Sequence, residues 1–317
     1  MIEIRNLVKT YGDIKAVRDI SFDVNKGEIL GFLGPNGAGK STTMNIITGA
    51  ISATSGSVKI NGYDILEQAE EAKSCIGYLP EQPPLYTDMT VIEYLKFIAD
   101  LKLVPRADQV KHIAKIMALL KISDVRGRLI DNLSKGYKQR VGVAQALIGD
   151  PKIIILDEPT VGLDPKQIKD IRNTIRGLSK NHTVILSSHI LSEIQASCDR
   201  VVIISNGQLA YENRIDAIGK GDDDTNLLEI IAKGSRDKSL DLLKSISGVQ
   251  RVRSISSDRD SSTFELETPH DLDVREAVFD AFVRTHTTIL GMRTLNPTLE
   301  DIFLKVTSSG QHFSEGE

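Results

Sequence analysis

The stretch Gly34-Pro-Asn-Gly-Ala-Gly-Lys-Ser41 decides the fold of this chain. It matches the pattern G-x-x-x-x-G-K-[ST] of a phosphate-binding loop, or P-loop. Its three glycines let the backbone curl so that successive N–H groups point inward, toward an anion. The apolar run Glu28–Leu33 directly before it predicts a buried strand, and a helix is predicted from about Lys40. Strand, loop and helix together are the context that a P-loop requires.

The residues of this loop differ in what they offer to a chain of phosphates. Lys40 is expected to reach the β- and γ-phosphates of a nucleotide, and Ser41 to offer its hydroxyl to Mg²⁺. The helix that follows points the positive end of its dipole at the same phosphates. The predicted phosphate-binding residues are Gly34, Pro35, Asn36, Gly37, Ala38, Gly39, Lys40, Ser41 and Thr42.

A second motif, Ile153-Ile-Ile-Leu-Asp-Glu-Pro159, is an apolar run that ends in two carboxylates. A nearly continuous apolar run is typical of a central parallel strand that is buried on both faces. Ligands of such sheets gather beyond the carboxyl ends of the strands. Asp157 is therefore expected beside the P-loop, where it would hold Mg²⁺, and Glu158 near the γ-phosphate, where it would polarise the attacking water.

Around these motifs, short apolar runs alternate with helical patterns over residues 1 to about 215, which predicts an α/β fold with a parallel sheet. Further strands are predicted at Val58–Ile60, Ile76–Leu79, Val184–Leu186 and Val201–Ile204.

A helical subdomain, at about residues 85–150, interrupts this alternation. Thr90 and Glu93 have the spacing of a capping box, which predicts the start of a helix. Apolar residues then recur at helical spacing along two helices, and Pro105 marks the end of the first. The predicted apolar faces consist of Val91, Tyr94, Leu95, Ile98 and Leu101 in the first helix, and of Val110, Ile113, Ile116, Met117 and Leu120 in the second.

The composition changes at 219–225, where Gly and three acidic residues predict a linker. We therefore expect two domains, residues 1–218 and 219–317. The second domain is predicted to run strand 227–233, helix 237–246, strand 249–256, strand 262–268, helix 273–286 and strand 287–294, which is the βαββαβ order of a small α+β, ferredoxin-like domain. A last helix follows Pro297, with Thr298 as its cap.

The composition excludes several classes of protein. No run approaches the ~18 apolar residues that span a bilayer, and the N-terminus lacks the apolar core of a signal peptide. The net charge of −4 argues against a general nucleic-acid binder, which usually carries a basic excess. We therefore expect a cytoplasmic protein without a nucleic-acid partner.

With both motifs placed, residues 1 to about 215 strongly resemble the nucleotide-binding subunit of an ABC transporter. The run Leu133-Ser-Lys-Gly-Tyr137 resembles the LSGGQ signature of that family. In the family, the Ser and the second Gly touch the γ-phosphate of ATP bound to the other subunit, and by position these are Ser134 and Gly136. Lys135 and Tyr137 depart from the pattern.

The resemblance also assigns roles to single residues elsewhere in the chain. Gly162-Leu-Asp164 resembles the D-loop, which crosses the subunit interface, and His189 resembles the switch histidine that contacts the γ-phosphate. Tyr11 resembles the aromatic residue that stacks on adenine, a contact that tolerates other bases and leaves GTP open. Where the family has a Gln that meets Mg²⁺ and water, this chain has Glu81, with Gln82 one position later, and either could take the role.

The resemblance implies an ATP-hydrolysing subunit that needs Mg²⁺, pairs head to tail with a second copy or a homologous subunit, and drives a separate membrane permease. The expected location is the inner face of the cell membrane, and the permease contact is expected at residues 85–122 and the Glu81 loop. The ending 296–304 is similar to that of ATPase subunits of bacterial exporters in the multidrug and gliding-motility branch. For the C-terminal domain, regulation, dimer contact and stabilisation all stay open. The alternatives are an ABC-type ATPase with a non-transport role and a P-loop NTPase of another class.

Overall fold

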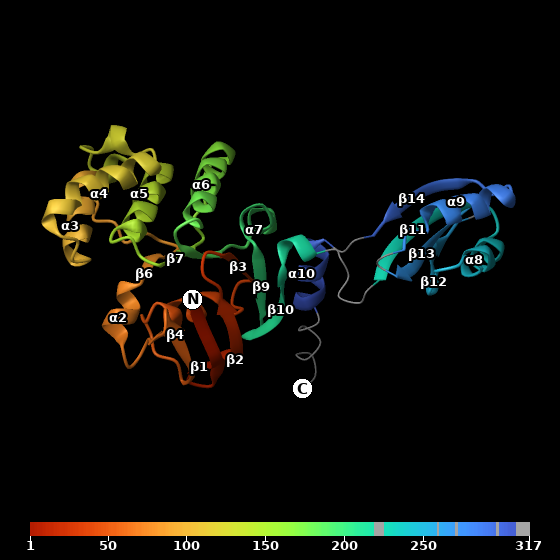
Figure 1. The fold of residues 1–317 in the computed structure, drawn as a ribbon, viewed down its shortest axis with the longest axis horizontal. Coiled ribbons are helices and arrows are strands. Elements are labelled where there is room, and N and C mark those ends of the chain that lie inside the picture. Colours follow the sequence, from red (N-terminus) through yellow and green to blue (C-terminus); the bar gives the residue numbers. More distant parts are fainter. Residues whose placement is uncertain (219–224, 259, 270–271, 296–297, 309–317) are drawn as a thin grey trace. The chain divides into compact units, whose positions relative to one another are not determined.

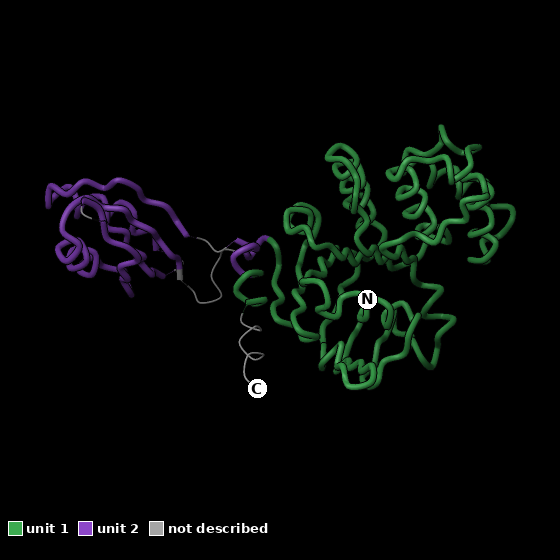
Figure 2. Tube along the Cα trace, turned by 180° about the vertical axis from the view of Figure 1, so that it is seen from behind, with its two compact units in different colours: residues 1–215, 303–317 green, residues 216–302 purple. Residues whose placement is uncertain are grey.

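The computed structural model describes residues 1–218, 225–258, 260–269, 272–295 and 298–308 (Figure 1). It divides into two compact units, Met1–Ile215 with Phe303–Glu317, and Asp216–Ile302 (Figure 2). The sequence division at 218/219 differs from this in two respects, because it assigned residues 216–218 to the first domain and the residues from Phe303 onward to the second. A linker pattern marks where the chain leaves the first unit. It does not indicate whether a segment farther along the chain belongs to the first unit again. None of the described helices is long and apolar enough to cross a membrane.

The first unit contains a six-stranded sheet with the strand order β10-β9-β3-β8-β7-β6. Strands β3, β6, β7, β8 and β9 pair in parallel, and β10 pairs antiparallel with β9. Every residue of β3, β7 and β8 is buried, so the apolar runs correctly predicted central strands. The strand bounds are β3 Ile29–Leu33, β6 Ile76–Leu79, β7 Ile153–Asp157, β8 Thr183–Ser187, β9 Arg200–Ser205 and β10 Gln208–Arg214.

A four-stranded antiparallel sheet, with the order β2-β1-β4-β5, was largely missed by the sequence analysis. The expected strand Val58–Ile60 belongs to it as part of β4. One hydrophobic cluster joins the two sheets, and in it the rings of Phe22 and Phe32 lie 5.7 Å apart. The strand bounds are β1 Ile2–Tyr11, β2 Ile14–Val24, β4 Ser55–Ile60 and β5 Tyr63–Asp64.

Three helices, Val91–Leu101, Arg106–Leu119 and Lys135–Leu147, lie within residues 85–150, and Thr90 and Glu93 form the expected capping box. Two residues of the expected apolar faces are instead exposed, Leu101 at 62% and Val110 at 72%. Leu101 is the last residue of its helix, and Val110 lies in the early turns of the next. The apolar periodicity of the sequence therefore extends beyond the buried part of each helix. The helix bounds are α1 Lys40–Ile47, α2 Ala69–Ser74, α3 Val91–Leu101, α4 Arg106–Leu119, α5 Lys135–Leu147, α6 Pro165–Leu178 and α7 Leu191–Ser197, with 3-10 turns η1 Ser123–Val125, η2 Ile130–Asn132 and η3 Ile215–Ala217.

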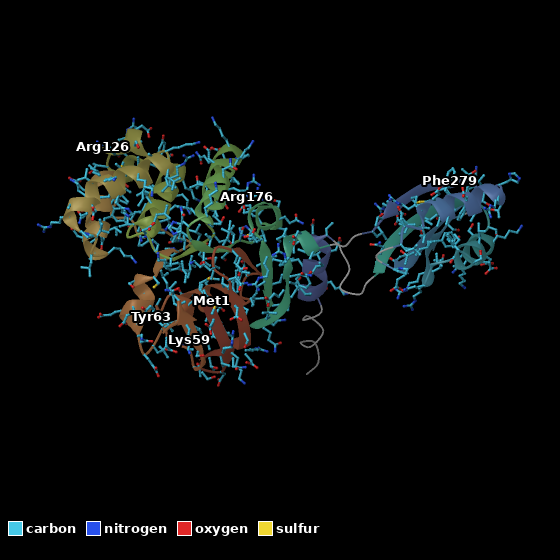
Figure 3. All side chains as sticks on the ribbon, viewed as in Figure 1. Met1, Lys59, Tyr63, Arg126, Arg176 and Phe279 are labelled. Atoms are coloured by element: carbon cyan, nitrogen blue, oxygen red, sulfur yellow. The ribbon has the colours of Figure 1, made fainter. Side chains whose placement is uncertain are left out.

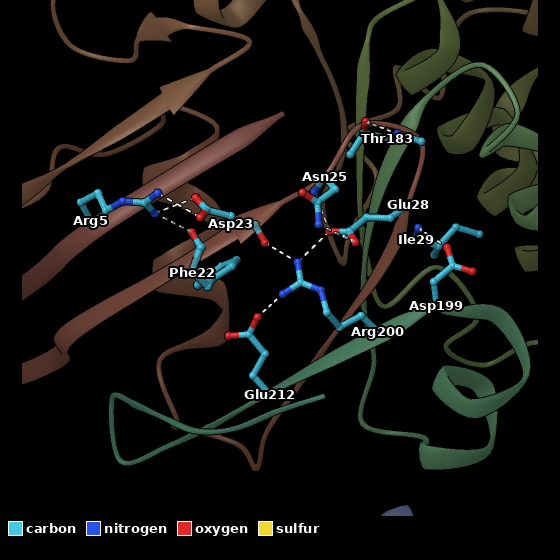
Figure 4. Close-up of polar contacts among 11 residues, drawn as sticks. Arg5, Phe22, Asp23, Asn25, Glu28, Ile29, Thr183, Asp199, Arg200 and Glu212 are labelled. Atoms are coloured by element: carbon cyan, nitrogen blue, oxygen red, sulfur yellow. Dashed lines mark hydrogen bonds and ion pairs between the residues drawn. The ribbon is translucent and has the colours of Figure 1, made fainter. Parts of the chain in front are cut away.

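A polar network holds the N-terminal ends of the parallel strands together (Figure 4). Nη2 of Arg200, at the start of β9, donates to Oε1 of Glu28 at 2.7 Å, and only 13% and 14% of the two side chains is exposed. Arg200 also pairs with Glu212 of β10 and donates to the main-chain carbonyl of Asp23. This network lies at the edge of the sheet opposite the one where ligands of parallel sheets bind, so we assign it a structural role.

The second unit contains one antiparallel sheet with the order β12-β13-β11-β14, and its elements follow the expected strand–helix–strand–strand–helix–strand order. Its core includes Phe264 of β13 and Phe282 of α9, both fully buried. Phe279, on the same helix, is 57% exposed (Figure 3). The bounds in this unit are β11 Thr225–Lys233, α8 Arg236–Lys244, β12 Arg251–Ser257, β13 Ser261–Pro269, α9 Arg275–Arg284 and β14 Ile289–Thr294. The last helix, α10 Leu299–Ser308, spans the boundary between Ile302 and Phe303 at which the two units are divided.

Candidate functional site

The P-loop connects β3 to α1, as its sequence predicts. Gly39, directly before α1, has φ 101°, and a Cβ at this position would lie 2.5 Å from the carbonyl oxygen of Ala16. A Cβ on Gly34 would lie 2.4 Å from the carbonyl oxygen of Ile204. Both positions therefore require glycine, because other parts of the backbone pass too close for any side chain.

The Lys40 ammonium is folded into this loop. Its Nζ donates to the carbonyl oxygens of Gly34 at 2.7 Å and Pro35 at 3.1 Å. Burial lowers the pKa of Lys40, while the carboxylates of Glu158 and Asp157 act in the opposite direction. The candidate phosphate-binding lysine and the candidate acidic residues thus lie close enough to affect one another electrostatically.

The other candidate loop residues differ in exposure. Asn36, Gly37 and Ser41 are exposed, Pro35 and Thr42 are half-buried, and Ala38 is buried. Thr43, which was not among the predicted phosphate-binding residues, is completely buried. Its Oγ1 donates to the carbonyl oxygen of Gly39 at 2.8 Å and so secures the turn between loop and helix. A serine or threonine four positions after the N-cap of a predicted helix is the sequence signal that could have indicated this hydrogen bond.

The two acidic residues occupy the end of β7 and the turn after it. Glu158 has φ 49°, in the left-handed region, and its N–H donates to the carbonyl oxygen of Ser187 at 3.0 Å. Both carboxylate oxygens of Glu158 lie 2.9 Å from Nδ1 of His189. Because β7 and β8 are neighbours in the sheet, Glu158 and His189 meet although they are far apart in the chain.

Both carboxylates are largely removed from solvent, with Asp157 5% and Glu158 8% exposed. Burial raises the pKa of Asp157, and the charge of Glu81 raises it further. Burial likewise raises the pKa of Glu158, while the hydrogen bond from His189 lowers it. Concentrated negative charge at a buried strand end is suited to a cation and to orienting water.

The donor set fits Mg²⁺. Asp157 and Ser41 offer a carboxylate and a hydroxyl oxygen, and Mg²⁺ is usually bound through one or two carboxylates plus phosphates and water. Within the described ranges, no group of three or more His, Cys, Asp and Glu side chains could hold a metal alone. Glu81 and Gln82 are both exposed and follow β6, which pairs with β7, the strand that ends at Asp157.

The residues that resemble the signature motif lie at the start of α5. Ser134 is the N-cap of this helix and accepts a hydrogen bond from the N–H of Tyr137 at 3.5 Å. Gly136 is buried, and a Cβ there would lie 2.4 Å from Oε1 of Gln167. A side chain at position 136 would therefore have to displace the end of the Gln167 side chain.

The candidate D-loop lies against the start of α5. A Cβ on Gly162 would lie 2.0 Å from Nζ of Lys135, so the lysine that departs from the family pattern lies over this loop. Asp164 is the N-cap of α6, and its Oδ1 accepts from the N–H of Gln167 at 2.9 Å. Tyr11, at the end of β1, is 49% exposed, with the Lys9 ammonium 5.1 Å from the ring centroid.

The structure thus brings Lys40, Asp157, Glu158 and His189 together at one edge of the parallel sheet. The described contacts of Tyr11, Ser134 and Asp164 are made elsewhere, with their own local neighbours.

Comparisons with known proteins point to one family. Residues 17–161 match the family model described as ABC transporter. The ATP-binding protein YxlF of Bacillus subtilis (strain 168), named an uncharacterized ABC transporter protein, is 32% identical over 306 residues, which cover 96% of this chain and 99% of YxlF. The linearmycin resistance ATP-binding protein LnrL of the same strain is 30% identical over 309 residues, which cover 97% and 98% of the two chains.

A solved structure of a dimeric ATP-binding cassette, bound to ADP and Pi in a post-hydrolysis state, is 26% identical with a TM-score of 0.63. It covers 68% of this chain, and the match includes 99% of that structure. The two Bacillus subtilis relatives match nearly the whole chain. The chain therefore belongs to the ABC transporter family, as an ATP-binding protein with an ABC-type ATPase domain.

Proposed function

We propose that this chain is the ATP-hydrolysing subunit of an exporter and drives a separate membrane permease. The observation that carries the proposal is the pair formed by Glu158 and His189, 2.9 Å apart at the edge of the sheet that also holds Lys40. A carboxylate fixed by a histidine beside a phosphate-binding loop is suited to orienting a water for attack on a phosphoryl group. The name of LnrL, a resistance protein, supports export.

In this proposal, each candidate residue acts on one part of the nucleotide. Lys40 leaves the carbonyl oxygens of the loop and neutralises the β- and γ-phosphates, together with the N–H groups of the loop. Asp157 and Ser41 would hold Mg²⁺, which would supply further neutralisation of the phosphates. Tyr11 stacks on the base. Glu158 holds the attacking water, and His189 fixes the carboxylate in place.

The site is completed by a second copy of the chain. Ser134 is exposed at the N-terminus of α5, and a helix N-terminus attracts anions such as the γ-phosphate of a partner's ATP. Gly136 keeps this helix end free of side-chain bulk, and Asp164 lies on the loop expected at the interface. The dimeric state of a solved relative supports such a pair. ATP closes the dimer and hydrolysis releases it, a two-state motion that the permease reads at residues 85–122 and the Glu81 or Gln82 loop.

The proposal is tested with Glu158→Gln. We expect this variant to bind ATP, to hydrolyse it at least about 100-fold more slowly, and to accumulate as an ATP-bound dimer in size-exclusion chromatography. Ser134→Arg in the same background should abolish the dimer, whereas Ser123→Arg, which adds the same side chain elsewhere in the helical subdomain, should not. Normal turnover in Glu158→Gln would refute the role of Glu158, and a dimer that survives Ser134→Arg would refute the shared site.

A further inference from the structure

Glu193, on α7, is a buried acidic residue that belongs to none of the motifs discussed above. It is 5% exposed, and its Oε2 accepts hydrogen bonds from two hydroxyls. One is Oγ1 of Thr160, at 2.6 Å, and the other is Oγ of Ser188, at 3.3 Å. Thr160 is 4% exposed and Ser188 is fully buried, so all three side chains meet away from solvent.

These two hydroxyl residues belong to the two segments that carry the candidate catalytic pair. Thr160 lies two residues after Glu158, in a turn where the N–H of Val161 donates to the carbonyl oxygen of Glu158 at 3.3 Å. Ser188 directly precedes His189, and its Oγ also accepts from the N–H of Ile190 at 3.1 Å. One carboxylate therefore links the segment after β7 to the segment after β8.

We infer that Glu193 is a positioning residue of the ATPase site, which fastens the turn carrying Glu158 to the segment carrying His189. The inference rests on the proposed roles of those two residues. Glu158 is held in the left-handed region, at φ 49°, and such a backbone persists only where its surroundings over-determine it. The Glu193 carboxylate supplies part of that restraint, since it fixes Thr160 within the same turn.

The energetics of Glu193 argue against a purely stabilising role. Its Oε1 is buried and has no hydrogen-bond partner within the part of the chain that the structure describes. A buried carboxylate oxygen without a donor is destabilising, and apolar side chains of similar volume are often at least as stable in such places. A buried polar atom without a partner calls for an explanation, and positioning of the two candidate catalytic segments is the one that the contacts of Glu193 offer.

The test compares steady-state ATP hydrolysis and ATP binding in the full-length protein. Glu193→Ala should lower kcat by about 10-fold to 100-fold, because a displacement of about 1 Å in a catalytic group has an effect of that order, while ATP affinity changes by less than about threefold. Glu193→Gln keeps a carbonyl oxygen for both hydroxyls and should recover most of the lost kcat. Gln195→Ala, at an exposed position of the same helix, is the matched control.

A second measurement separates positioning from simple structural support. If Glu193 acts through Glu158, Glu193→Ala should cause no further loss of single-turnover rate when Glu158→Gln is already present. An unchanged kcat in Glu193→Ala, or an equal loss in both backgrounds, overturns the inference. If Glu193→Ala does not fold, the pair Thr160→Val and Ser188→Ala removes the same hydrogen bonds and is subject to the same criteria. Normal turnover in Glu158→Gln alone contradicts the proposed function, whereas a normal Glu193→Ala contradicts only this inference.

Discussion

The ion pair between Glu28 and Arg200 should contribute more to stability than any exposed pair of similar length. Its 2.7 Å contact lies between side chains that are 14% and 13% exposed. Glu28→Ala leaves the Arg200 guanidinium in place, largely buried, with Glu212 and the carbonyl oxygen of Asp23 as remaining partners. Breaking a buried pair in this way typically costs 3–5 kcal/mol. We expect the lower end, about 3 kcal/mol, because these two partners remain.

The exposed pair between Arg5 and Asp23 provides the matched control in the same unit. Its atoms are 2.6 Å apart, closer than those of the buried pair, but 47% of each side chain is exposed. Solvent and salt screen such a pair, so Arg5→Gln should leave stability almost unchanged. If the distance between the paired atoms decided the loss of stability, Arg5→Gln would be the more destabilising of the two variants. The comparison therefore separates the effect of burial from the effect of distance.

Scanning calorimetry is the suitable assay, because two compact units need not unfold together. For a unit of about 200 residues, each kcal/mol corresponds to roughly 2–4 °C, so Glu28→Ala should lower the Tm of the first unit by about 6–12 °C. Replacing both partners with methionine should be less harmful than Glu28→Ala, since no charge is then left without its main partner. Equal Tm values for Glu28→Ala and Arg5→Gln would refute the argument from burial.

Two further predictions concern the site and the packing of the sheet. His189→Ala removes the only described hydrogen-bond partner of the Glu158 carboxylate, and should lower kcat by about 10²–10⁴-fold while ATP affinity, measured with a fluorescent analogue, changes little; a normal kcat would show that Glu158 does not need the histidine. Gly77→Ala should unfold or strongly destabilise the first unit in a urea titration, because its Cβ would lie 1.8 Å from the carbonyl oxygen of Ala146. Gly177→Ala, in open space on α6, is the control and should be neutral or stabilising by up to about 1 kcal/mol. Similar urea midpoints for the two variants would contradict the steric reasoning.

The sequence predicted the parallel sheet well because its signals are local. A run such as Ile153–Leu156 is apolar throughout since both faces of β7 are covered, and this can be recognised without knowing the partners. Strands β1 and β2 were missed because bulges interrupt the regular alternation of buried and exposed side chains, with register shifts between Ile4 and Leu7 and between Lys9 and Thr10. Their identity as strands depends on pairing with each other and with β4, which is a tertiary property.

The same distinction between local and long-range signals applies to the residues of the candidate site. Glycines and lysine of the P-loop are recognisable because phosphate binding demands adjacent residues at fixed spacing. The contact between Glu158 and His189 could be expected only through the family resemblance, as 31 residues separate them. Glu193 was missed altogether, because its partners Thr160 and Ser188 lie on two other segments and no motif relates the three.

The local geometry also distinguishes the candidate interface residues from one another. Asp164 accepts a 2.9 Å hydrogen bond from the first turn of α6, so helix capping accounts for an acidic residue there without any partner chain. The end of the Gln167 side chain likewise limits the space at Gly136 within one chain. Ser134 differs, because its capping contact with the N–H of Tyr137 is long, at 3.5 Å, and its hydroxyl is exposed at a helix N-terminus. A hydroxyl so weakly engaged within its own chain remains available to an anion, and for this reason Ser134, rather than Asp164 or Gly136, is the residue on which a test of the shared site should depend.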